Sequence, residues 1–500
     1  MQNLRRDLLA KGGLGVAHTP GAPVYPVNIL QFGEGNFLRA FVDWQIDVAN
    51  GQGLFQGGVV VAQPLAQGMA GAINGQDGVY TVLMRGIEGG REVENRRAVS
   101  CVQRCLNPYE QWDELLVLAA DPGLRFVISN TTEAGIADAQ EAYVPGKCPD
   151  NFPAKVTALL AARFAKLGGG KATGLVFLPC ELIEANGTNL KRIVLGHARR
   201  WGLAEDFIAW VEQDNYFLDT LVDRIVPGYP AGEAKDLCAS WGYQDNLIVA
   251  AEPFHVWVVQ GPKALAEEFP LHKAGINIVW TDDLKPYRTR KVRILNGAHT
   301  ACSLAAYRAG LDTVKSMIDD ATLSAFLKKV MFDEIVPFVP LPEEERQSYA
   351  HTIWERFSNP YIRHELISIA LNSVSKWTVR CLPTVKDYAA ARGTAPAGLS
   401  FSLAALLWFY KGQRQGAEYV GQREAGSYPI KDDAQVIAIL SAAWAAAQPG
   451  QAAALVPVLL ADTRLWGQDL TVVPGLAEQT AKALTAIEAK GIKAALADLA

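Results

Sequence analysis

The stretch PYRTRKVRILNGAHTA, residues 286–301, holds three side chains whose types and spacing fit acid–base chemistry on an alcohol. Lys291, Asn296 and His299 are separated by five and three positions. On an α-helix, Asn296 would lie about 140° around the axis from Lys291, and His299 about 80°. The three side chains would then share one side of a helix.

Oxidation of an alcohol by a nicotinamide cofactor needs a base for the hydroxyl proton while hydride leaves the carbon. A lysine can be that base when burial and nearby positive charge lower its pKa. Arg288, Arg290 and Arg293 flank Lys291 and would supply such charge. Lys291 is therefore the candidate base of a reaction that needs no metal.

The other two side chains fit the same chemistry. The amide of Asn296 can donate a hydrogen bond to a developing alkoxide, and His299 can orient the substrate or share the proton. The spacing alone also describes a basic, solvated helix start with a capping asparagine and a packed histidine.

A glycine turn near the start of the chain is a candidate cofactor site. In QFGEGNFLRAF, residues 31–41, Gly33 and Gly35 stand where an expected strand over 27–33 ends and a helix begins. Glycines there permit close approach of a pyrophosphate, and the N–H groups of the helix start, at Asn36 and Phe37, can bind it. The third glycine of the usual fingerprint is absent, so the same residues also describe an ordinary turn.

Two further segments follow expected strands. The strand over 57–63 ends at Gln63 with no acid to bind the ribose hydroxyls and no arginine to hold a 2′-phosphate, which favours NAD. The segment SNTTEAG, residues 129–135, places Asn130, Thr131 and Glu133 where ligands bind in open α/β folds. The alternative for this segment is a helix start with Glu133 in its first turn.

The composition sets wide limits on function. The chain has 500 residues, of which 50% are hydrophobic, so two or three domains with large cores are expected. A net charge of -5 gives no general attraction to nucleic acid or an anionic membrane. We find no apolar run of the roughly 18 residues that a membrane span needs, and no signal peptide. We expect a cytoplasmic monomer or weak homo-oligomer.

The seven cysteines are odd in number, widely spaced and form no CxxC pattern, which argues against a disulfide framework. Cys101 and Cys105 could share a helix face, but two thiols do not complete a tetrahedral zinc site. We predict no metal site.

The order of expected elements indicates an α/β class with two parts. Short apolar strands over 27–33, 57–63, 124–130 and 174–180 alternate with helices, which is typical of a mostly parallel, Rossmann-like sheet. From about Lys291 onward the periodicity is helical. We predict a Rossmann-like NAD-binding domain over 1–280 and a mainly α-helical substrate-binding and catalytic domain over 281–500.

The pattern PYxxxKxRxLNxxH over 286–299 strongly resembles the polyol-specific long-chain dehydrogenases, the mannitol dehydrogenase family. The glycine turn and SNTTEAG resemble further signatures of this family, as do the segments over 178–187, 221–227, 251–259 and 355–364. The resemblance implies NAD as cofactor, no metal, Lys291 as general base, and assisting roles for Asn296 and His299. The residues within these motifs are most similar to those of family members that interconvert a hexonate and a keto-hexuronate.

The resemblance also suggests further site residues. An asparagine that completes an oxyanion hole in mannitol-type members falls on Asn186 in one alignment, which we prefer, and on Leu182 in another. Asp223 matches an acid of the segment VDRI, where it would contact substrate or tie loops together.

A sugar-acid substrate carries a carboxylate, so its pocket needs a cation. Arg363, His364 and Lys376 are the candidates we select, with Arg356 and Arg380 as further ones. Each of them also fits a surface charge or an interhelix salt bridge.

Other functions remain open at this point. Within the same family, the substrate could be fructuronate or an uncharged polyol such as mannitol. Outside it, the chain could be a nucleotide-sensing protein without activity, or a sugar-acid epimerase with tightly held NAD.

Overall fold

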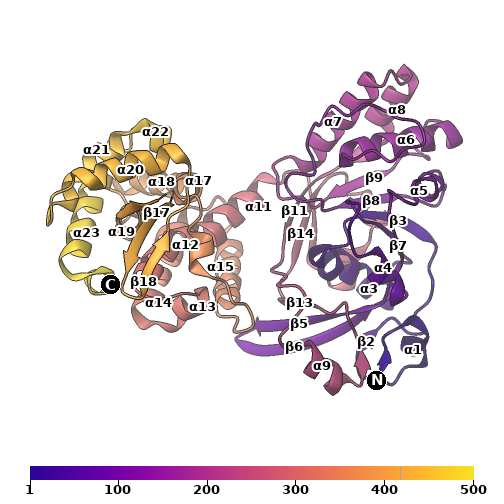
Figure 1. Ribbon diagram of the computed structural model, residues 1–500, viewed down its shortest axis with the longest axis horizontal. Helices are drawn as coiled ribbons and strands as arrows, with labels where there is room; N and C mark the ends of the chain where they lie inside the picture. Colours follow the sequence, from indigo (N-terminus) through magenta and orange to yellow (C-terminus); the bar gives the residue numbers. More distant parts are fainter. Residues whose placement is uncertain (417, 500) are drawn as a thin grey trace. The chain divides into compact units, whose positions relative to one another are not determined.

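The computed structural model describes residues 1–416 and 418–499 (Figure 1). Contacts between Cα atoms divide the chain into two compact units, Met1–Leu284 and Lys285–Ala500.

A six-stranded parallel sheet forms the centre of the first unit. Its strands are β3 (Val27–Phe32), β4 (Gly58–Ala62), β7 (Val102–Leu106), β8 (Phe126–Ser129), β9 (Val176–Pro179) and β10 (Tyr216–Phe217). They lie in the order β7-β4-β3-β8-β9-β10, so the winding of the chain reverses between β3 and β8. This is the strand order of the dinucleotide-binding fold, whose ligands bind at the carboxyl ends of the strands beside that reversal. The predicted Rossmann-like sheet is confirmed.

Both faces of this sheet are covered, which is why its strands are short apolar runs. Ile29 packs into the core on one face, with α3 (Trp44–Gly51). Leu30 and Phe32 pack into the core on the other face. The helices of that second face are α5 (Trp112–Ala119), α6 (Phe152–Leu167), α7 (Asn186–Arg200) and α8 (Glu205–Asp214).

The remaining longer strands of the first unit lie outside the parallel sheet. They are β5 (Tyr80–Glu88), β6 (Arg91–Val99), β11 (Asp219–Asp223), β13 (Val249–Ala251), β14 (Val256–Gln260) and β15 (Ile278–Thr281). β5 and β6 form an antiparallel hairpin. Cys101 follows this hairpin and Cys105 lies within β7, so the expected shared helix face is wrong.

The second unit is mainly helical, as predicted. Its longer segments are α12 (Gly297–Arg308), α14 (Ala321–Lys328), α15 (Glu343–Phe357), α17 (Ser373–Arg380), α18 (Leu382–Arg392), α19 (Ala397–Phe409), α20 (Ala434–Ala446) and α23 (Leu476–Lys490). Nearly every residue of α12 and α19 is buried, so these two helices form the centre. An antiparallel sheet of β16 (Gly412–Gln415), β17 (Glu418–Arg423) and β18 (Gly426–Pro429) was not predicted, because its strands are mostly polar and their buried residues do not alternate with exposed ones.

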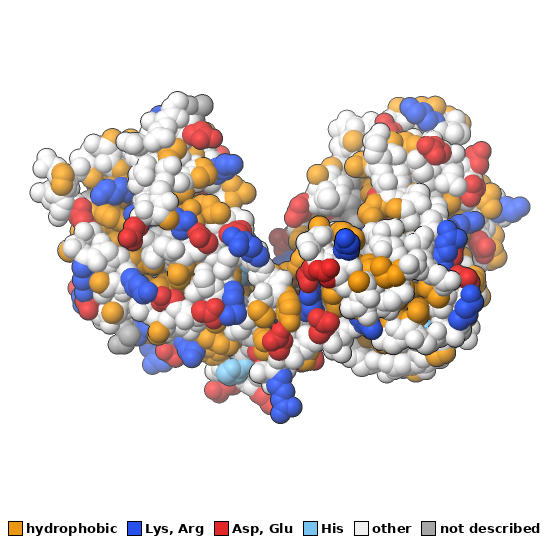
Figure 2. All heavy atoms as spheres, turned by 60° about the horizontal axis from the view of Figure 1, so that its bottom comes forward, with side chains coloured by type: hydrophobic (Ala, Val, Ile, Leu, Met, Phe, Trp, Pro, Cys, Tyr) orange, Lys and Arg blue, Asp and Glu red, His pale blue; other side chains and the backbone are white. Residues whose placement is uncertain are grey.

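Within residues 1–416 and 418–499, no helix combines the length and apolar character of a membrane span. On the face drawn in Figure 2, Lys and Arg side chains are interspersed with Asp and Glu side chains over both units. This mixture agrees with the small net charge of -5.

A buried carboxylate caps α19 and allows a test of the second unit's stability. Glu334 is 4% exposed and accepts the backbone N–H groups of Gly398 at 2.7 Å and Leu399 at 2.8 Å. Removing it leaves two buried donors without an acceptor, so Glu334→Ala should lower the free energy of unfolding by about 2 kcal/mol or more. Chemical denaturation measures this change. The matched variant Asp333→Ala, at an exposed neighbouring acid, should change it by less than about 0.5 kcal/mol, and equal losses in both would contradict the capping role.

Candidate active site

The glycine turn lies where the winding of the sheet reverses. Gly33 follows β3 and Asn130 follows β8, and these two strands are neighbours. Gly33 has a φ of +118°, and a Cβ on it would lie 2.8 Å from the backbone oxygen of Asn130. Only glycine fits a position with this φ and so little space.

Gly35 is glycine for a different reason. Its φ is -66°, and a Cβ built on it would meet no protein atom within 4 Å. Neither backbone conformation nor protein packing therefore requires glycine at this exposed position. A pyrophosphate resting on the turn would require it, and the helix that begins at Asn36, α2 (Asn36–Leu38), presents its N–H groups there. The turn fits a dinucleotide.

The buried side chain of Arg39 holds this turn by hydrogen bonds. Sequence reasoning did not identify Arg39 as a site residue. The side chain is 2% exposed and donates to the backbone oxygens of Glu34 at 3.1 Å and Leu247 at 2.7 Å. It also donates to Oδ1 of Asn36 at 2.7 Å. The arginine inside the apolar run FLRAF could have indicated this role, because a charged side chain that is buried must be hydrogen-bonded. Phe37 stacks on Phe41, with ring centroids 4.9 Å apart.

Gln63 organises the loop after β4. Its amide nitrogen donates to the backbone oxygens of Leu65 at 2.9 Å and Ala66 at 3.0 Å, and its oxygen accepts Ala70 N–H at 3.1 Å. These bonds occupy the amide, which favours a structural role over the predicted ribose contact.

Glu34 brings a carboxylate to the same loop. Its Oε1 lies 2.6 Å from the point where a Cβ on Gly68 would be. Burial raises the pKa of Glu34, and the Met69 backbone amide opposes part of that shift. The sequence reasoning placed no acid at this loop, because Glu34 comes from the glycine turn and not from the end of β4.

The segment after β8 is a turn, so the alternative of a helix start at residues 129–135 is wrong. The reason is Glu181, which is 2% exposed and accepts both the N–H and the hydroxyl of Thr131 at 2.9 Å and the hydroxyl of Ser129 at 3.0 Å. Burial raises the pKa of Glu181. Asn130 donates to the backbone oxygen of Cys180 at 3.1 Å, and Glu133 is exposed.

Asn186 is 1% exposed, and both the nitrogen and the oxygen of its side-chain amide form hydrogen bonds. Its nitrogen donates to the backbone oxygens of Pro179 at 3.0 Å and Glu181 at 3.1 Å. Its oxygen accepts the N–H groups of Gly187 and Thr220, each at 2.9 Å. This arrangement favours a structural role for Asn186 over the predicted oxyanion contact, while Leu182, the other alignment, is 61% exposed.

Lys291 and Asn296 mark the two ends of a π-helical segment, η3 (Lys291–Asn296), between α11 (Lys285–Arg290) and α12. A π-helix joins residues five apart by its hydrogen bonds and occurs frequently at functional sites. Asn296 therefore lies about one turn further along the helix than Lys291, which corrects the 140° expected for an α-helix. His299 follows three residues later in α12, so the three side chains share a face. Lys291 and Asn296 are partly exposed and His299 is 8% exposed.

Two of the arginines that flank Lys291 in the sequence form ion pairs with carboxylates. Arg290 pairs with Glu345 at 2.7 Å, and Arg293 pairs with Asp387 at 2.5 Å. These carboxylates offset much of the positive charge that was expected to act on Lys291.

The structure brings His299 and His364 together. The ring of His299 stacks on Phe357, with centroids 4.2 Å apart, and meets the ring of His364 edge-on at 5.0 Å. Burial lowers the pKa of His364. Arg363 points elsewhere: its side chain is 78% exposed and pairs with Glu365 at 2.5 Å, which fits a surface charge rather than the predicted substrate contact.

Lys376 and Arg380 both lie on α17 and are partly exposed. Asp223, the remaining candidate, is 6% exposed at the end of β11. Its neighbour Arg224 donates to the backbone oxygens of Ala40 at 2.6 Å and Glu252 at 2.9 Å, so the segment VDRI does tie chain segments together.

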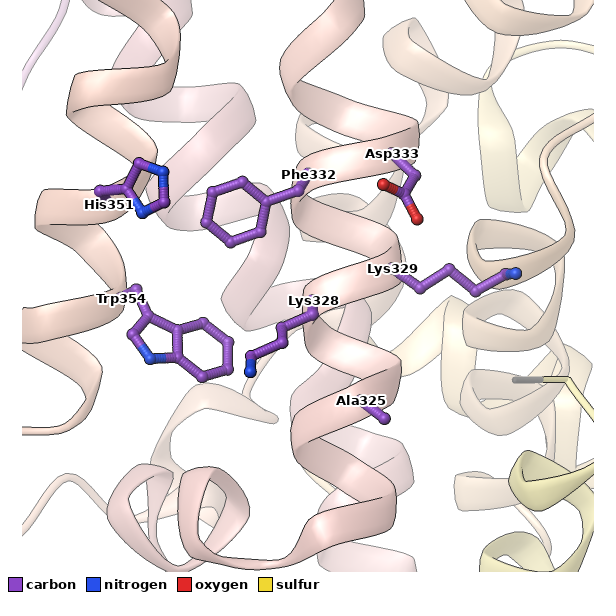
Figure 3. Close-up of a pocket in the computed structure, with 7 residues that line it drawn as sticks. All are labelled: Ala325, Lys328, Lys329, Phe332, Asp333, His351 and Trp354. Atoms are coloured by element: carbon purple, nitrogen blue, oxygen red, sulfur yellow. The ribbon is translucent and has the colours of Figure 1, made fainter.

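A surface hollow of about 690 Å³ on α14, η4 (Lys329–Ile335) and α15 contains none of the predicted site residues. Figure 3 shows His351 and Trp354 facing Phe332 and Lys328, while Lys329 and Asp333 point to the other side of the central helix. These side chains do not converge on one point, so the hollow has no arrangement suited to catalysis.

Comparison with known proteins agrees with this geometry. Residues 27–273 match the mannitol dehydrogenase Rossmann domain, and residues 283–488 match the mannitol dehydrogenase C-terminal domain. The chain is 46% identical over 476 residues to an altronate oxidoreductase of Yersinia enterocolitica, covering 95% of this chain and 97% of that protein. It is 45% identical over 483 residues to an altronate oxidoreductase of Escherichia coli, covering 96% and 98%.

Two solved structures share the fold over nearly the whole chain. Substrate-free D-sorbitol dehydrogenase superposes with a TM-score of 0.80 at 22% identity, covering 99% of this chain and 100% of that one. Pseudomonas fluorescens mannitol 2-dehydrogenase, in a ternary complex with NAD and D-mannitol, superposes with a TM-score of 0.70 at 21% identity, covering 100% and 99%. From the two domain matches and the full-length relatives, the chain belongs to the mannitol dehydrogenase family.

Proposed function

We propose that this chain is an NAD-dependent tagaturonate reductase, which interconverts D-altronate and D-tagaturonate. The observation that carries the substrate assignment is the identity of 46% to an altronate oxidoreductase over 95% of the chain. The geometry of both units supports the class of reaction.

We infer that the first unit binds the cofactor. Gly33 and Gly35 leave room for the pyrophosphate, and Arg39 holds the turn by hydrogen bonds to Glu34 and Asn36 and anchors it to Leu247 by a third. Glu34 supports NAD over NADP, because its carboxylate at the loop after β4 would repel a 2′-phosphate.

The proposed chemistry uses the polar face that begins at Lys291. NAD, when bound, supplies the hydride acceptor for alcohol oxidation and, in its reduced form, the hydride donor. Neutral Lys291 takes the proton of the altronate hydroxyl, and protonated Lys291 returns it to the carbonyl oxygen of tagaturonate. Asn296 donates a hydrogen bond to that oxygen, and His299 positions a neighbouring hydroxyl.

A substrate panel tests this function. Purified protein should oxidise NADH rapidly with tagaturonate, and more slowly by about ten-fold or more with fructuronate or fructose, because a binding pocket discriminates by its polar contacts. NADPH should support less activity than NADH. Absorbance at the nicotinamide band follows the reaction. If the protein prefers fructuronate or fructose, its substrate is a different one within the family. If it turns over no keto-sugar, the alternative of a nucleotide-sensing protein without activity is favoured.

We also propose a cytoplasmic location. All seven cysteines are buried as free thiols, an arrangement that suits a reducing compartment.

A further inference from the structure

Two cations of α17 lie close together without a carboxylate between them. Lys376 and Arg380 are four residues apart on this helix, so their side chains lie on the same face one turn apart. Like charges at this spacing destabilise a helix. Burial and the neighbouring Arg380 lower the pKa of Lys376, and burial lowers the pKa of Arg380.

The hydrogen bonds of both cations go to uncharged groups. Arg380 donates to the hydroxyl of Thr300 at 3.1 Å, and Lys376 donates to the backbone oxygen of Ile369 at 3.0 Å. Among residues 1–416 and 418–499, neither forms an ion pair with a carboxylate. Asp432 is the acid whose charge raises the pKa of Lys376, and its carboxylate also accepts the hydroxyl of Tyr410 and the N–H of Val374. One acid near two cations leaves net positive charge for an anion, above all at Arg380.

Arg380 lies along the start of α12. Its backbone oxygen is 3.3 Å from the point where a Cβ on Gly297 would be, and Gly297 directly follows Asn296. The Thr300 hydroxyl that its guanidinium reaches lies four residues after Asn296, on the same helix face. The guanidinium is therefore within about one helical turn of the proposed oxyanion donor, a separation that a six-carbon sugar acid can span.

We propose that Arg380, with Lys376 beside it, binds the carboxylate of the sugar acid and so makes the enzyme specific for hexuronates over uncharged ketoses. The inference rests on the proposed function and deepens it. A planar guanidinium can hold a carboxylate by two parallel hydrogen bonds. The bound anion would also relieve the repulsion between the two cations. The carbonyl end of the substrate would then face Asn296 and Lys291.

The test compares a charged and an uncharged substrate in Arg380→Met. With tagaturonate, kcat/KM should fall about 100-fold, mainly through KM, because a half-buried charge pair is lost. With tagatose, which lacks the carboxylate, kcat/KM should stay the same or rise. Arg380→Lys keeps the charge but loses the paired bonds, so it should recover part of the activity with tagaturonate. The control Arg392→Met, at an exposed arginine of the same unit, should behave as wild type.

Calorimetric titration of tagaturonate into the NAD-saturated protein gives a second measurement that does not depend on turnover. An equal loss for tagaturonate and tagatose in Arg380→Met, or unchanged binding of tagaturonate, would overturn the proposal. If Arg380→Met does not fold, Arg380→Lys decides the question by the same comparison of the two sugars. Wild-type protein that binds tagaturonate but does not reduce it would contradict the proposed function alone.

Discussion

Lys291→Ala should lower turnover with tagaturonate on the order of 1,000-fold, while the affinity for NADH should stay at the wild-type level. The loss is large because, in the proposed mechanism, the amine alone accepts and returns the substrate proton. Stopped-flow oxidation of NADH measures turnover, and nicotinamide fluorescence measures the affinity.

Two further variants make this result specific. Lys482→Ala, at an exposed lysine of α23, should match wild type in both measurements. Lys291→Arg keeps a positive charge but cannot give up a proton near neutral pH, so it should be as inactive as the alanine variant. Near-normal turnover in Lys291→Ala would exclude the lysine as the base.

Alanine at the two glycines of the cofactor turn should give two different results. Gly33→Ala must adopt a φ of +118° with its Cβ 2.8 Å from the Asn130 oxygen, so it should lower both the stability, by about 1–3 kcal/mol, and the affinity for NADH. Gly35→Ala meets no protein atom and keeps an ordinary φ, so its stability should be unchanged. Its affinity for NADH should nevertheless fall about ten-fold or more, since the methyl group occupies the space of the pyrophosphate.

Thermal unfolding without cofactor and fluorescence titration with NADH separate these effects. Each glycine serves as the control for the other, because the added methyl group is the same. If Gly35→Ala binds NADH as wild type does, the pyrophosphate does not rest on this turn, and the assignment of the cofactor site is wrong.

The hydrophobic pattern was sufficient for the architecture. Apolar runs of four to six residues, buried on both faces, predicted β3, β4, β8 and β9, and the change to helical periodicity near Lys291 predicted the second unit. The strands β16, β17 and β18 were missed, because they are mostly polar and their few buried apolar residues, Tyr419, Val420 and Tyr428, form neither an apolar run of that length nor an alternating pattern.

Within the candidate site, sequence reasoning anticipated the backbone conformation best where the residue type is demanded locally. Gly33 illustrates this, because a positive φ at a strand–helix turn can be anticipated from the motif alone. The partners of amide side chains were predicted poorly. Gln63 and Asn186 were assigned to ligands, but their amides bind the backbone, since any buried amide bonds to whatever donors and acceptors the fold brings close.

The sequence by itself predicted the family and the doubly wound sheet, both of which are confirmed, and it selected the glycine turn and the Lys291, Asn296 and His299 set as candidates, because each depends on residue types at short, fixed spacings. Only the tertiary structure decided which cations have carboxylate partners. Arg290, Arg293 and Arg363 are paired and Arg380 is bonded to a hydroxyl, although all four have the same side chain. The physical reason is that the net charge at a site depends on all charged side chains within a few ångströms, including those of segments distant in the sequence. Residue spacing within one segment does not predict the distances to those other segments.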